Sequence, residues 1–191
     1  PKKGDTIWMG AIDKEGTAVS FIQSLFWEFG SGLVCPETGV CFQNRGASFS
    51  LKTGPNKLLP GKKPFHTLNP ALAILKDGRR MVYGTMGGDG QPQTQSAIFS
   101  RYVYFNHNLQ QSISLPRWLL GKTWGETGTS LKLETRFEEQ IVKKLKLIGH
   151  EVEMLTDYSD LVGHAGALVL NHKGLIEGAF DPRSDGSALV F

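Results

Sequence analysis

The order of the predicted elements indicates an α+β fold, in which helices pack on an antiparallel sheet. Segments with strand character come first, helical segments occupy the middle of the chain, and strands return towards its end. The first strand is apolar on both faces, which is typical of a strand inside a layered structure. We expect a single domain over residues 1–191, because a chain of 191 residues with 40% hydrophobic content can bury one sizeable core.

The start of the chain predicts a β-hairpin. Two apolar runs flank a polar connection in which Gly16 can adopt the left-handed conformation that closes a three-residue loop. Such a loop sets Asp13 opposite Thr17, and counting outward places Thr6 opposite Ser24 on the same face. We therefore expect the hydroxyls of Thr6 and Ser24 to lie within hydrogen-bonding distance. A two-residue loop would put them on opposite faces instead.

The hydroxyl of Thr6 is a candidate nucleophile. A threonine attacks weakly unless a base takes its proton, and cleavage of the chain immediately before Thr6 would free an α-amino group that can act as this base. The sequence Gly-Asp-Thr at 4–6 is compatible with such a junction. From the hairpin alone, an ordinary strand residue stays open as the alternative.

The middle of the chain predicts a long irregular segment and a glycine-rich turn. Residues 44–64 are rich in Gly, Pro, Asn and Ser, and loops of this length inside a domain are usually either functional or disordered. Gly87 and Gly88 stand between a strand and a helix, where backbone N–H groups without side chains form a candidate anion site. The alternative is a tight turn that binds nothing.

An amphipathic helix is expected over 136–148. Its apolar residues share one stripe: Phe137, Ile141, Leu145 and Ile148. Acidic residues come early and lysines late, which suits the helix dipole, and Gly149 follows as the stop. The remaining elements are short strands at 33–34 and 40–43, a hairpin of 72–75 with 81–85, helices at 93–105 and 109–115, and strands at 130–134, 151–155, 163–171 and 175–179.

Composition and charge argue against several classes of protein. The 21 Lys and Arg and 18 Asp and Glu are mixed along the chain, so neither nucleic-acid nor membrane binding is expected. No apolar run is long enough to cross a bilayer, and the first residues do not read as a signal peptide. Cys35 and Cys41 are expected to be free thiols. No cofactor and no metal is expected, because His and Cys are not clustered at ligand spacing.

Six motifs stand at characteristic mutual spacings: Gly-Asp-Thr at 4–6, Asp-Lys-Glu-Gly at 13–16, Phe-Gly-Ser-Gly at 29–32, Pro-Gly-Lys-Lys-Pro at 60–64, Met-Gly-Gly at 86–88 and Asp-Pro-Arg-Ser-Asp-Gly at 181–186. Together they resemble the small subunit of the γ-glutamyltranspeptidase family of N-terminal nucleophile hydrolases. The resemblance implies a four-layer αββα sandwich, completed by a large subunit cut from the same precursor. It implies residues 1–5 as a precursor tail and 6–191 as the mature subunit, and it allows a dimer of heterodimers.

The resemblance also implies roles for single residues. Thr6 matches the nucleophile of the family, and Ser24 matches a second hydroxyl that orients it. Gly87 and Gly88 match the oxyanion-hole glycines, whose N–H groups stabilise the tetrahedral intermediate. Phe26 stands where γ-glutamyl enzymes have an Asn.

The substrate-binding positions depart from the γ-glutamyl pattern. Arg45 and Ser48 stand where those enzymes have a Gln and the Asp that grips an α-amino group. His66 and Thr67 replace two adjacent serines. Because a guanidinium prefers a carboxylate, the change indicates a small acid that lacks the α-amino group. The alternatives are an Arg45 that faces solvent or Glu37, a capped loop His66, and a Ser48 that makes only a loop hydrogen bond.

Several segments are similar to the oxamate amidohydrolase branch of the family, among them Thr-Ile-Trp-Met-Gly and Pro-Phe-His-Thr-Leu-Asn-Pro. This similarity implies a self-processing Thr-nucleophile amidohydrolase that cleaves the amide of a small, oxamate-like carboxylate through an acyl-enzyme. Glutathione hydrolase or γ-glutamyltransferase and cephalosporin acylase are alternatives, and an unprocessed, non-catalytic scaffold is an alternative of another class. We expect a cytoplasmic protein, with any targeting signal on the large subunit.

Overall fold

A four-stranded antiparallel sheet forms the centre of the fold. The computed structural model describes residues 4–123 and 128–191. The strands of the sheet, in spatial order, are β3 (Ala71–Ile74), β4 (Arg80–Thr85), β8 (Ala165–Leu170) and β9 (Ile176–Phe180). Each predicted strand of this sheet is confirmed to within two residues at either end.

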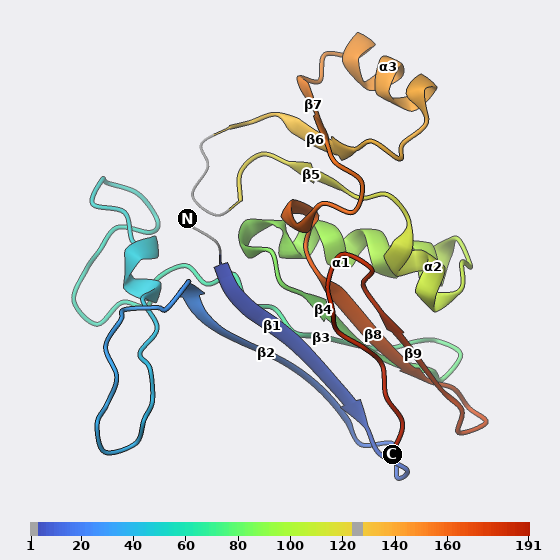
Figure 1. Cartoon of the computed structure of the whole chain (residues 1–191), viewed down its shortest axis with the longest axis horizontal. Coiled ribbons are helices and arrows are strands. Elements are labelled where there is room, and N and C mark those ends of the chain that lie inside the picture. Colours follow the sequence, from blue (N-terminus) through green and yellow to red (C-terminus); the bar gives the residue numbers. More distant parts are fainter. Residues whose placement is uncertain (1–3, 124–127) are drawn as a thin grey trace.

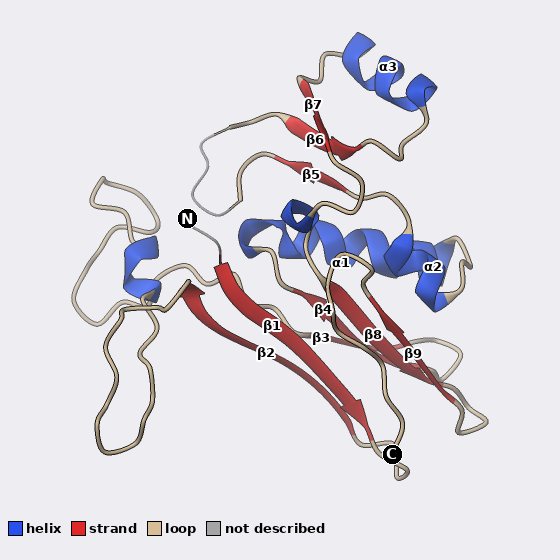
Figure 2. Ribbon diagram, in the orientation of Figure 1, coloured by secondary structure: helices blue, strands red, loops and turns tan. Residues whose placement is uncertain are grey.

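A different layer covers each face of this sheet (Figures 1 and 2). Met81 of β4 packs with helices α1 (Gln91–Phe99) and α2 (Leu109–Ser114), whereas Val82 packs with the first hairpin. Neighbouring residues of a strand point to opposite faces, so the helices and the hairpin lie on opposite sides. The chain thus forms an α+β arrangement of helices, sheet and hairpin in three layers.

The first hairpin has the register predicted from its loop. β1 (Gly4–Ile12) pairs with β2 (Ala18–Trp27), and Thr6 lies opposite Ser24. The N–H of Asp13 donates to the carbonyl of Thr17 at 3.1 Å, and Gly16 has a φ of 80°. The three-residue loop is therefore confirmed. Asp5 lies opposite Phe26, so the register shift between Asp5 and Thr6 leaves Leu25 as an extra residue of β2, a bulge opposite the Asp5–Thr6 peptide bond.

Three glycines make room for the indole of Trp8, which holds β1 on the sheet. A Cβ added to Gly84 would lie 2.1 Å from that ring, and one added to Gly166 would lie 2.4 Å from it. The third glycine is Gly10. The indole Nε1 also donates to Ser20 Oγ at 3.0 Å. These contacts fix the strand only two residues from Thr6.

The outer face of the hairpin is uncovered in this chain. Its large apolar side chains are between 41% and 54% exposed: Ile7, Met9, Val19 and Phe21. The sequence predicted cover on both faces of the first strand. Among residues 4–123 and 128–191 only one face is covered, because the described elements that follow form a layer beneath the hairpin and none above it.

A second, smaller sheet lies beyond α1 (Figure 1). Its strands are β5 (Trp118–Leu120), β6 (Leu131–Glu134) and β7 (Val152–Leu155), with α3 (Glu139–Leu147) between the last two. The side-chain amide of Gln93 in α1 binds the backbone of Leu120 in β5 at 2.8 and 3.0 Å. This bond pair ties the small sheet to the start of α1. The sequence analysis missed β5, and it did not foresee that β6 and β7 are parallel.

The helices differ in extent from the prediction. α1 starts at Gln91, with Pro92 in its first turn, and continues as a π-helical turn over Ser100–Tyr104. α3 starts at Glu139 rather than at 136, because residues 134–137 form a turn closed by the N–H of Phe137 on the Glu134 carbonyl at 3.2 Å and Glu138 has a non-helical ψ of 134°. Short 3-10 turns cover Arg45–Ser48, Gly88–Gly90 and Asp160–Val162. No helix of the described residues is both long enough and apolar enough to span a bilayer.

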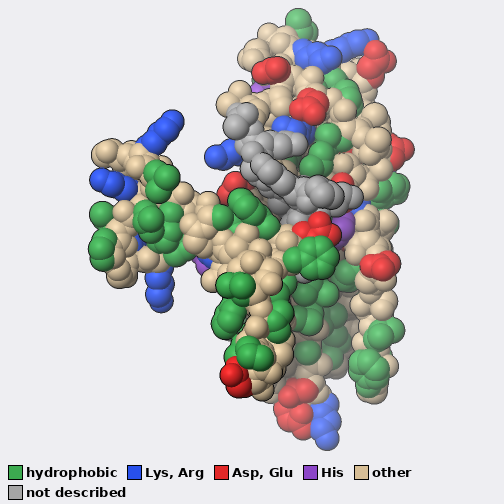
Figure 3. Space-filling model, turned by 60° about the vertical axis from the view of Figure 1, so that its left-hand side comes forward, with side chains coloured by type: hydrophobic (Ala, Val, Ile, Leu, Met, Phe, Trp, Pro, Cys, Tyr) green, Lys and Arg blue, Asp and Glu red, His purple; other side chains and the backbone are tan. Residues whose placement is uncertain are grey.

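Residues 28–66 form a lobe that stands apart from the layers. Figure 3 shows hydrophobic and basic side chains gathered on its surface. The two short strands predicted there are reduced to one isolated bridge between Val34 and Cys41. Cys35 and Cys41 are both free and half-buried. The lobe is an irregular loop because its many Gly and Pro residues interrupt strand pairing.

A buried ionic cluster explains the motif at 181–186. Arg183 donates to Glu134 at 2.6 and 2.7 Å, and Asp181 accepts from Arg117 and from its neighbour Arg183. Burial alone would raise the pKa of Glu134, but hydrogen bonds from Arg183 and from the N–H of Arg117 hold that pKa below its ordinary value. The motif therefore joins the two sheets.

Candidate functional site

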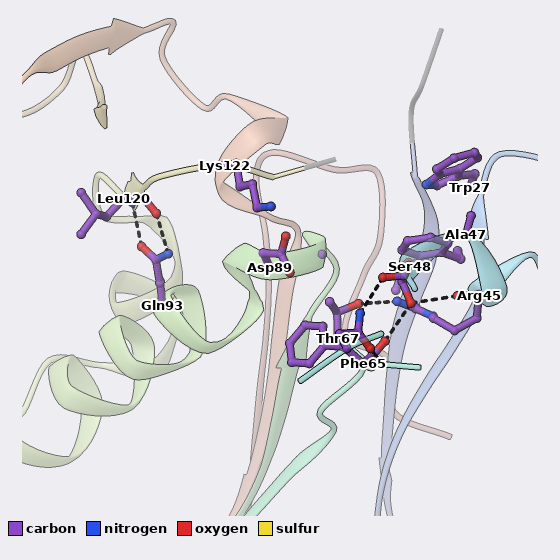
Figure 4. Close-up of a pocket in the computed structure, with 14 residues that line it drawn as sticks. Trp27, Arg45, Ala47, Ser48, Phe65, Thr67, Asp89, Gln93, Leu120 and Lys122 are labelled. Atoms are coloured by element: carbon purple, nitrogen blue, oxygen red, sulfur yellow. Dashed lines mark hydrogen bonds between the residues drawn. The ribbon is translucent and has the colours of Figure 1, made fainter. Parts of the chain in front are cut away.

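A cavity of about 590 Å³ lies where the hairpin, the lobe, the start of α1 and the end of β5 meet (Figure 4). Of the eight residues predicted for the site, five line it: Thr6, Arg45, Ser48, Thr67 and Gly88. The other three, Ser24, His66 and Gly87, do not line it. Segments far apart in the sequence therefore converge on one hollow, as the motifs predicted.

Thr6 lines the cavity, and a hydrogen bond to Ser24 orients its hydroxyl. Its Oγ1 lies 2.7 Å from Ser24 Oγ, and either oxygen can be the donor. Ser24 Oγ also accepts a hydrogen bond from the N–H of Phe26 at 2.8 Å. This second bond fixes the Ser24 side chain, which in turn orients Thr6. The predicted cross-strand pair is confirmed as geometry.

Phe26 has an unusual backbone conformation beside this pair. Its φ is 78°, in the left-handed region where a bulky residue is strained. Its ring stacks on Trp27 with centroids 5.6 Å apart, and the Arg45 guanidinium lies 3.9 Å from the ring centroid. The strain is thus balanced by contacts that build one wall of the cavity. The sequence analysis saw only that Phe26 departs from the pattern of the γ-glutamyl enzymes.

The guanidinium of Arg45 is buried in the same wall, against the Phe26 ring. The residue is only 5% exposed, and Nη1 donates to Thr67 Oγ1 at 3.0 Å. Burial lowers its pKa, and the carboxylate of Asp89 partly opposes that change. Within the described part of the chain no carboxylate pairs with it, and Glu37 instead accepts from Cys35 Sγ. The alternatives of solvent exposure and of a Glu37 ion pair are therefore wrong.

This arrangement can bind a small anion. A guanidinium that is stacked on a ring and held by one hydroxyl keeps further N–H donors in a planar fork, the geometry that suits a carboxylate. Arg45 and Thr6 border the same cavity. A carboxylate at Arg45 would hold the rest of a small molecule near the Thr6 hydroxyl.

Ser48 and His66 have more local contacts than Arg45. Ser48 Oγ donates to the carbonyls of Arg45 and Phe65 at 2.8 and 3.1 Å, so it makes the loop hydrogen bonds of the alternative interpretation while lining the cavity. His66 is exposed, and its Nδ1 accepts from the N–H of Leu68 at 3.2 Å. Partial burial and the nearby Arg45 charge lower the His66 pKa. This placement matches the capped loop histidine.

The glycine turn connects β4 to α1. Gly87 and Gly88 have φ values of 134° and 53°, so both need the conformational freedom of glycine. The Gly87 carbonyl accepts from Thr123 Oγ1 and from the N–H of Gly90, each at 2.9 Å. Among the described residues nothing accepts the N–H of Gly88. That N–H group is therefore a free donor on a residue that lines the cavity.

The structure adds cavity residues that the sequence analysis did not propose. Asp89, Gln93 and Lys122 line the mouth on the side away from Arg45 (Figure 4). Asp89 follows the glycine pair directly, which is the only local signal for it. Lys122 reaches the cavity through β5, a strand too short to stand out in the sequence. Across residues 4–123 and 128–191, no three His, Cys, Asp or Glu side chains form a metal-binding group.

Comparisons with known proteins place this geometry in a family. The profile of the gamma-glutamyltranspeptidase family matches residues 1–191. The oxamate amidohydrolase proenzyme of Klebsiella pneumoniae is 61% identical over 188 residues, which are 97% of this chain and 35% of that protein. The Glutathione hydrolase-like YwrD proenzyme of Bacillus subtilis is 47% identical over 99% of this chain and 36% of its own length. The chain thus spans about a third of the length of these relatives.

Solved structures share the fold. Cephalosporin acylase from Bacillus halodurans matches with a TM-score of 0.78 and 30% identity, over 94% of this chain and 33% of that chain. Gamma-glutamyltranspeptidase from Pseudomonas nitroreducens matches with a TM-score of 0.77 and 23% identity, over 98% of both chains. The second likeness shows the fold alone. The α+β fold expected from the order of the elements is confirmed, and the chain belongs to the gamma-glutamyltranspeptidase family.

Proposed function

We propose that this chain carries the catalytic residues of a Thr-nucleophile amidohydrolase that releases ammonia from the amide of a small carboxylate such as oxamate. One observation carries the proposal: Thr6 and the buried guanidinium of Arg45, which has no carboxylate partner in the described part of the chain, border one cavity. The 61% identity to a protein named oxamate amidohydrolase proenzyme supports the substrate class.

Maturation would begin with Thr6 itself, whose nitrogen forms a peptide bond with Asp5. In the proposed step Thr6 Oγ1 attacks the carbonyl carbon of Asp5, the peptide C–N bond breaks, and the hydroxyl proton passes to the Thr6 nitrogen. Water then hydrolyses the resulting ester and leaves Thr6 with a free α-amino group. The bulge of β2 opposite this peptide bond and the hydrogen bond from Thr6 to Ser24 support such an attack.

In the proposed reaction the substrate carboxylate binds Arg45, and the α-amine of Thr6 takes the proton from Oγ1 as it attacks the amide carbonyl. The new oxyanion accepts a hydrogen bond from the N–H of Gly88, with Gly87 as the second donor that the family resemblance implies. The C–N bond then breaks, and the proton held by the α-amine leaves with nitrogen as ammonia. Water, deprotonated by the same amine, hydrolyses the acyl ester, which releases the diacid and restores Thr6.

A large subunit from the same precursor would complete the αββα sandwich. The exposed outer face of the hairpin and the chain's span of about a third of its relatives support this partner. That subunit would supply the helical layer and sheet that this chain lacks on that side. A pairing of two heterodimers and a cytoplasmic location stay predictions.

The proposal is tested by ammonia release from oxamate with the full-length protein. Thr6→Ala is expected to abolish both turnover and cleavage of the precursor, because it removes the attacking oxygen of both reactions. Thr17→Ala is the matched control, since Thr17 is an exposed residue at the other end of the same hairpin. Retained turnover in Thr6→Ala would remove Thr6 from its role.

Substrate class is tested by comparing oxamate with glutamine, glutathione and a glutaryl cephalosporin, following the amine released from each. Oxamate is expected to have the highest kcat/KM, because Arg45 meets its carboxylate and no described carboxylate pairs with Arg45 in competition. A kcat/KM for glutathione above that for oxamate would contradict the proposed role of Arg45 and favour a γ-glutamyl enzyme.

A further inference from the structure

We propose that Thr123 is a positioning residue that holds and polarises the peptide group whose N–H stabilises the oxyanion. The inference rests on the proposed function and assigns to that site a residue far from Thr6 in the sequence. Thr123 follows β5 and the cavity residue Lys122. It touches neither the cavity nor the substrate, so it would act only through the glycine turn.

The contact between Thr123 and the turn is buried and specific. The Thr123 side chain is fully buried, and its Oγ1 donates to the Gly87 carbonyl at 2.9 Å. The N–H of Gly90 donates to the same oxygen, also at 2.9 Å. Both lone pairs of this carbonyl are therefore occupied, one by the N–H of Gly90 in the turn that follows and one by a hydroxyl from the segment after β5.

The carbonyl of Gly87 and the N–H of Gly88 belong to one peptide group. Fixing the carbonyl therefore fixes the direction of the N–H, which is the free donor on the residue that lines the cavity with Thr6. Hydrogen bonds that enter at a carbonyl also polarise the peptide and strengthen its N–H as a donor. An oxyanion donor gains from both effects, because it must already point at the developing charge.

The turn needs such an anchor because glycines flank this peptide on both sides. Gly87 and Gly88 have φ values of 134° and 53°, and residues without a Cβ resist rotation of the peptide plane weakly. The hydroxyl of Thr123 bonds to the Gly87 carbonyl and so sets the orientation of this peptide group.

The test compares Thr123→Val with Thr123→Ser in the matured full-length protein. Valine keeps the shape and removes the hydroxyl, so kcat for oxamate is expected to fall by about 10- to 100-fold, less than the loss of a whole oxyanion donor, while KM stays within about twofold. Serine keeps the donor and is expected to retain most of kcat. KM is expected to change little because the oxyanion forms only during the reaction and not when the substrate binds.

Thr94→Val is the matched control for loss of a buried threonine hydroxyl. Thr94 is 2% exposed, and its Oγ1 donates to the Val162 carbonyl at 2.8 Å rather than to the glycine turn. Both valine variants are expected to lower Tm by a similar amount, and only Thr123→Val is expected to lower kcat. Equal losses of kcat in the two valine variants would overturn the inference.

Two other results would also overturn it. One is an unchanged kcat in Thr123→Val, and the other is an equal loss in Thr123→Ser and Thr123→Val, which would assign the effect to shape rather than to the hydroxyl. In both cases wild-type turnover and an inactive Thr6→Ala would leave the proposed function intact. A wild-type protein that releases no ammonia from oxamate would defeat the proposed function and the inference together.

Discussion

Replacing Arg45 with methionine should strongly lower kcat/KM for oxamate without lowering the Tm of the protein. Arg45 is 5% exposed and has no carboxylate partner among the described residues, so burial of its charge lowers the free energy of unfolding. An apolar side chain of similar length removes that destabilisation and still packs on Phe26. We expect a Tm equal to or above that of the wild type, because uncompensated buried charge destabilises a fold.

The expected loss of activity follows from the contacts that the substrate would lose. Hydrogen bonds to charged groups contribute about 1.5 to 3 kcal/mol each, and a bidentate pair with the substrate carboxylate provides two. The free carboxylate regains its solvation when these bonds are lost, which offsets part of their contribution. The expected loss of transition-state stabilisation is therefore about 3 to 4 kcal/mol. Since each 1.4 kcal/mol is about tenfold, kcat/KM for oxamate should fall by about 100- to 1,000-fold.

The assay compares oxamate with oxamide, a neutral amide of the same size, by ammonia release. Arg45→Met should lower kcat/KM for oxamate but not for oxamide. The kcat/KM of Arg45→Lys for oxamate should lie between those of the wild type and Arg45→Met, because Lys keeps the charge without the planar fork. Arg79→Met is the matched control, since Arg79 also faces an aromatic ring, 5.0 Å from the centroid of Tyr102, but pairs with Asp77. A parallel loss for both substrates, or no loss for oxamate, would refute the assignment.

The remaining predictions concern the nucleophile, the packing beneath it and the response to acid. Ser24→Ala should lower kcat for oxamate by about 10- to 100-fold in steady-state assays, because Thr6 loses the partner that orients it, and an unchanged kcat would show that Ser24 is dispensable. Gly166→Ala should lower the free energy of unfolding by about 1 to 3 kcal/mol in urea titrations, since its Cβ would lie 2.4 Å from the Trp8 ring, and an unchanged midpoint would contradict this packing. The pKa of Glu134 is held below its ordinary value, so its contribution to stability is present above the unfolded-state pKa and is lost as pH falls through the folded-state pKa. Glu134→Gln should therefore flatten the acid side of a plot of Tm against pH, and an identical acid slope in both proteins would contradict this.

The sequence was most informative where local rules decide the geometry. The position of Gly16 set the loop length of the first hairpin, and the loop length set the register that brings Thr6 to Ser24. Strand and helix positions elsewhere followed from periodicity in the same way. The position of Gly87 and Gly88 between a strand and a helix predicted the glycine turn, and the family resemblance connected this turn and Arg45 to the hairpin.

The rest of the site depends on contacts between distant segments. The left-handed backbone of Phe26 results from the bulge and from stacking under Arg45, which no local propensity for Phe predicts. The placement of Arg45 depends on a hydrogen bond to Thr67, which lies 22 residues further along the chain. The bond from Thr123 to Gly87 spans 36 residues, and it exists only because β5 joins a second sheet. Such long-range pairings leave no periodic trace in one sequence.

The central claim, that Thr6 becomes a free amino terminus at the cavity, is tested most directly by intact-mass spectrometry of the purified full-length protein. The account predicts two polypeptides, the smaller beginning at Thr6, in the wild type and in Arg45→Met, and a single uncut polypeptide in Thr6→Ala. Full oxamate turnover by a protein whose Asp5–Thr6 peptide bond remains intact would contradict it.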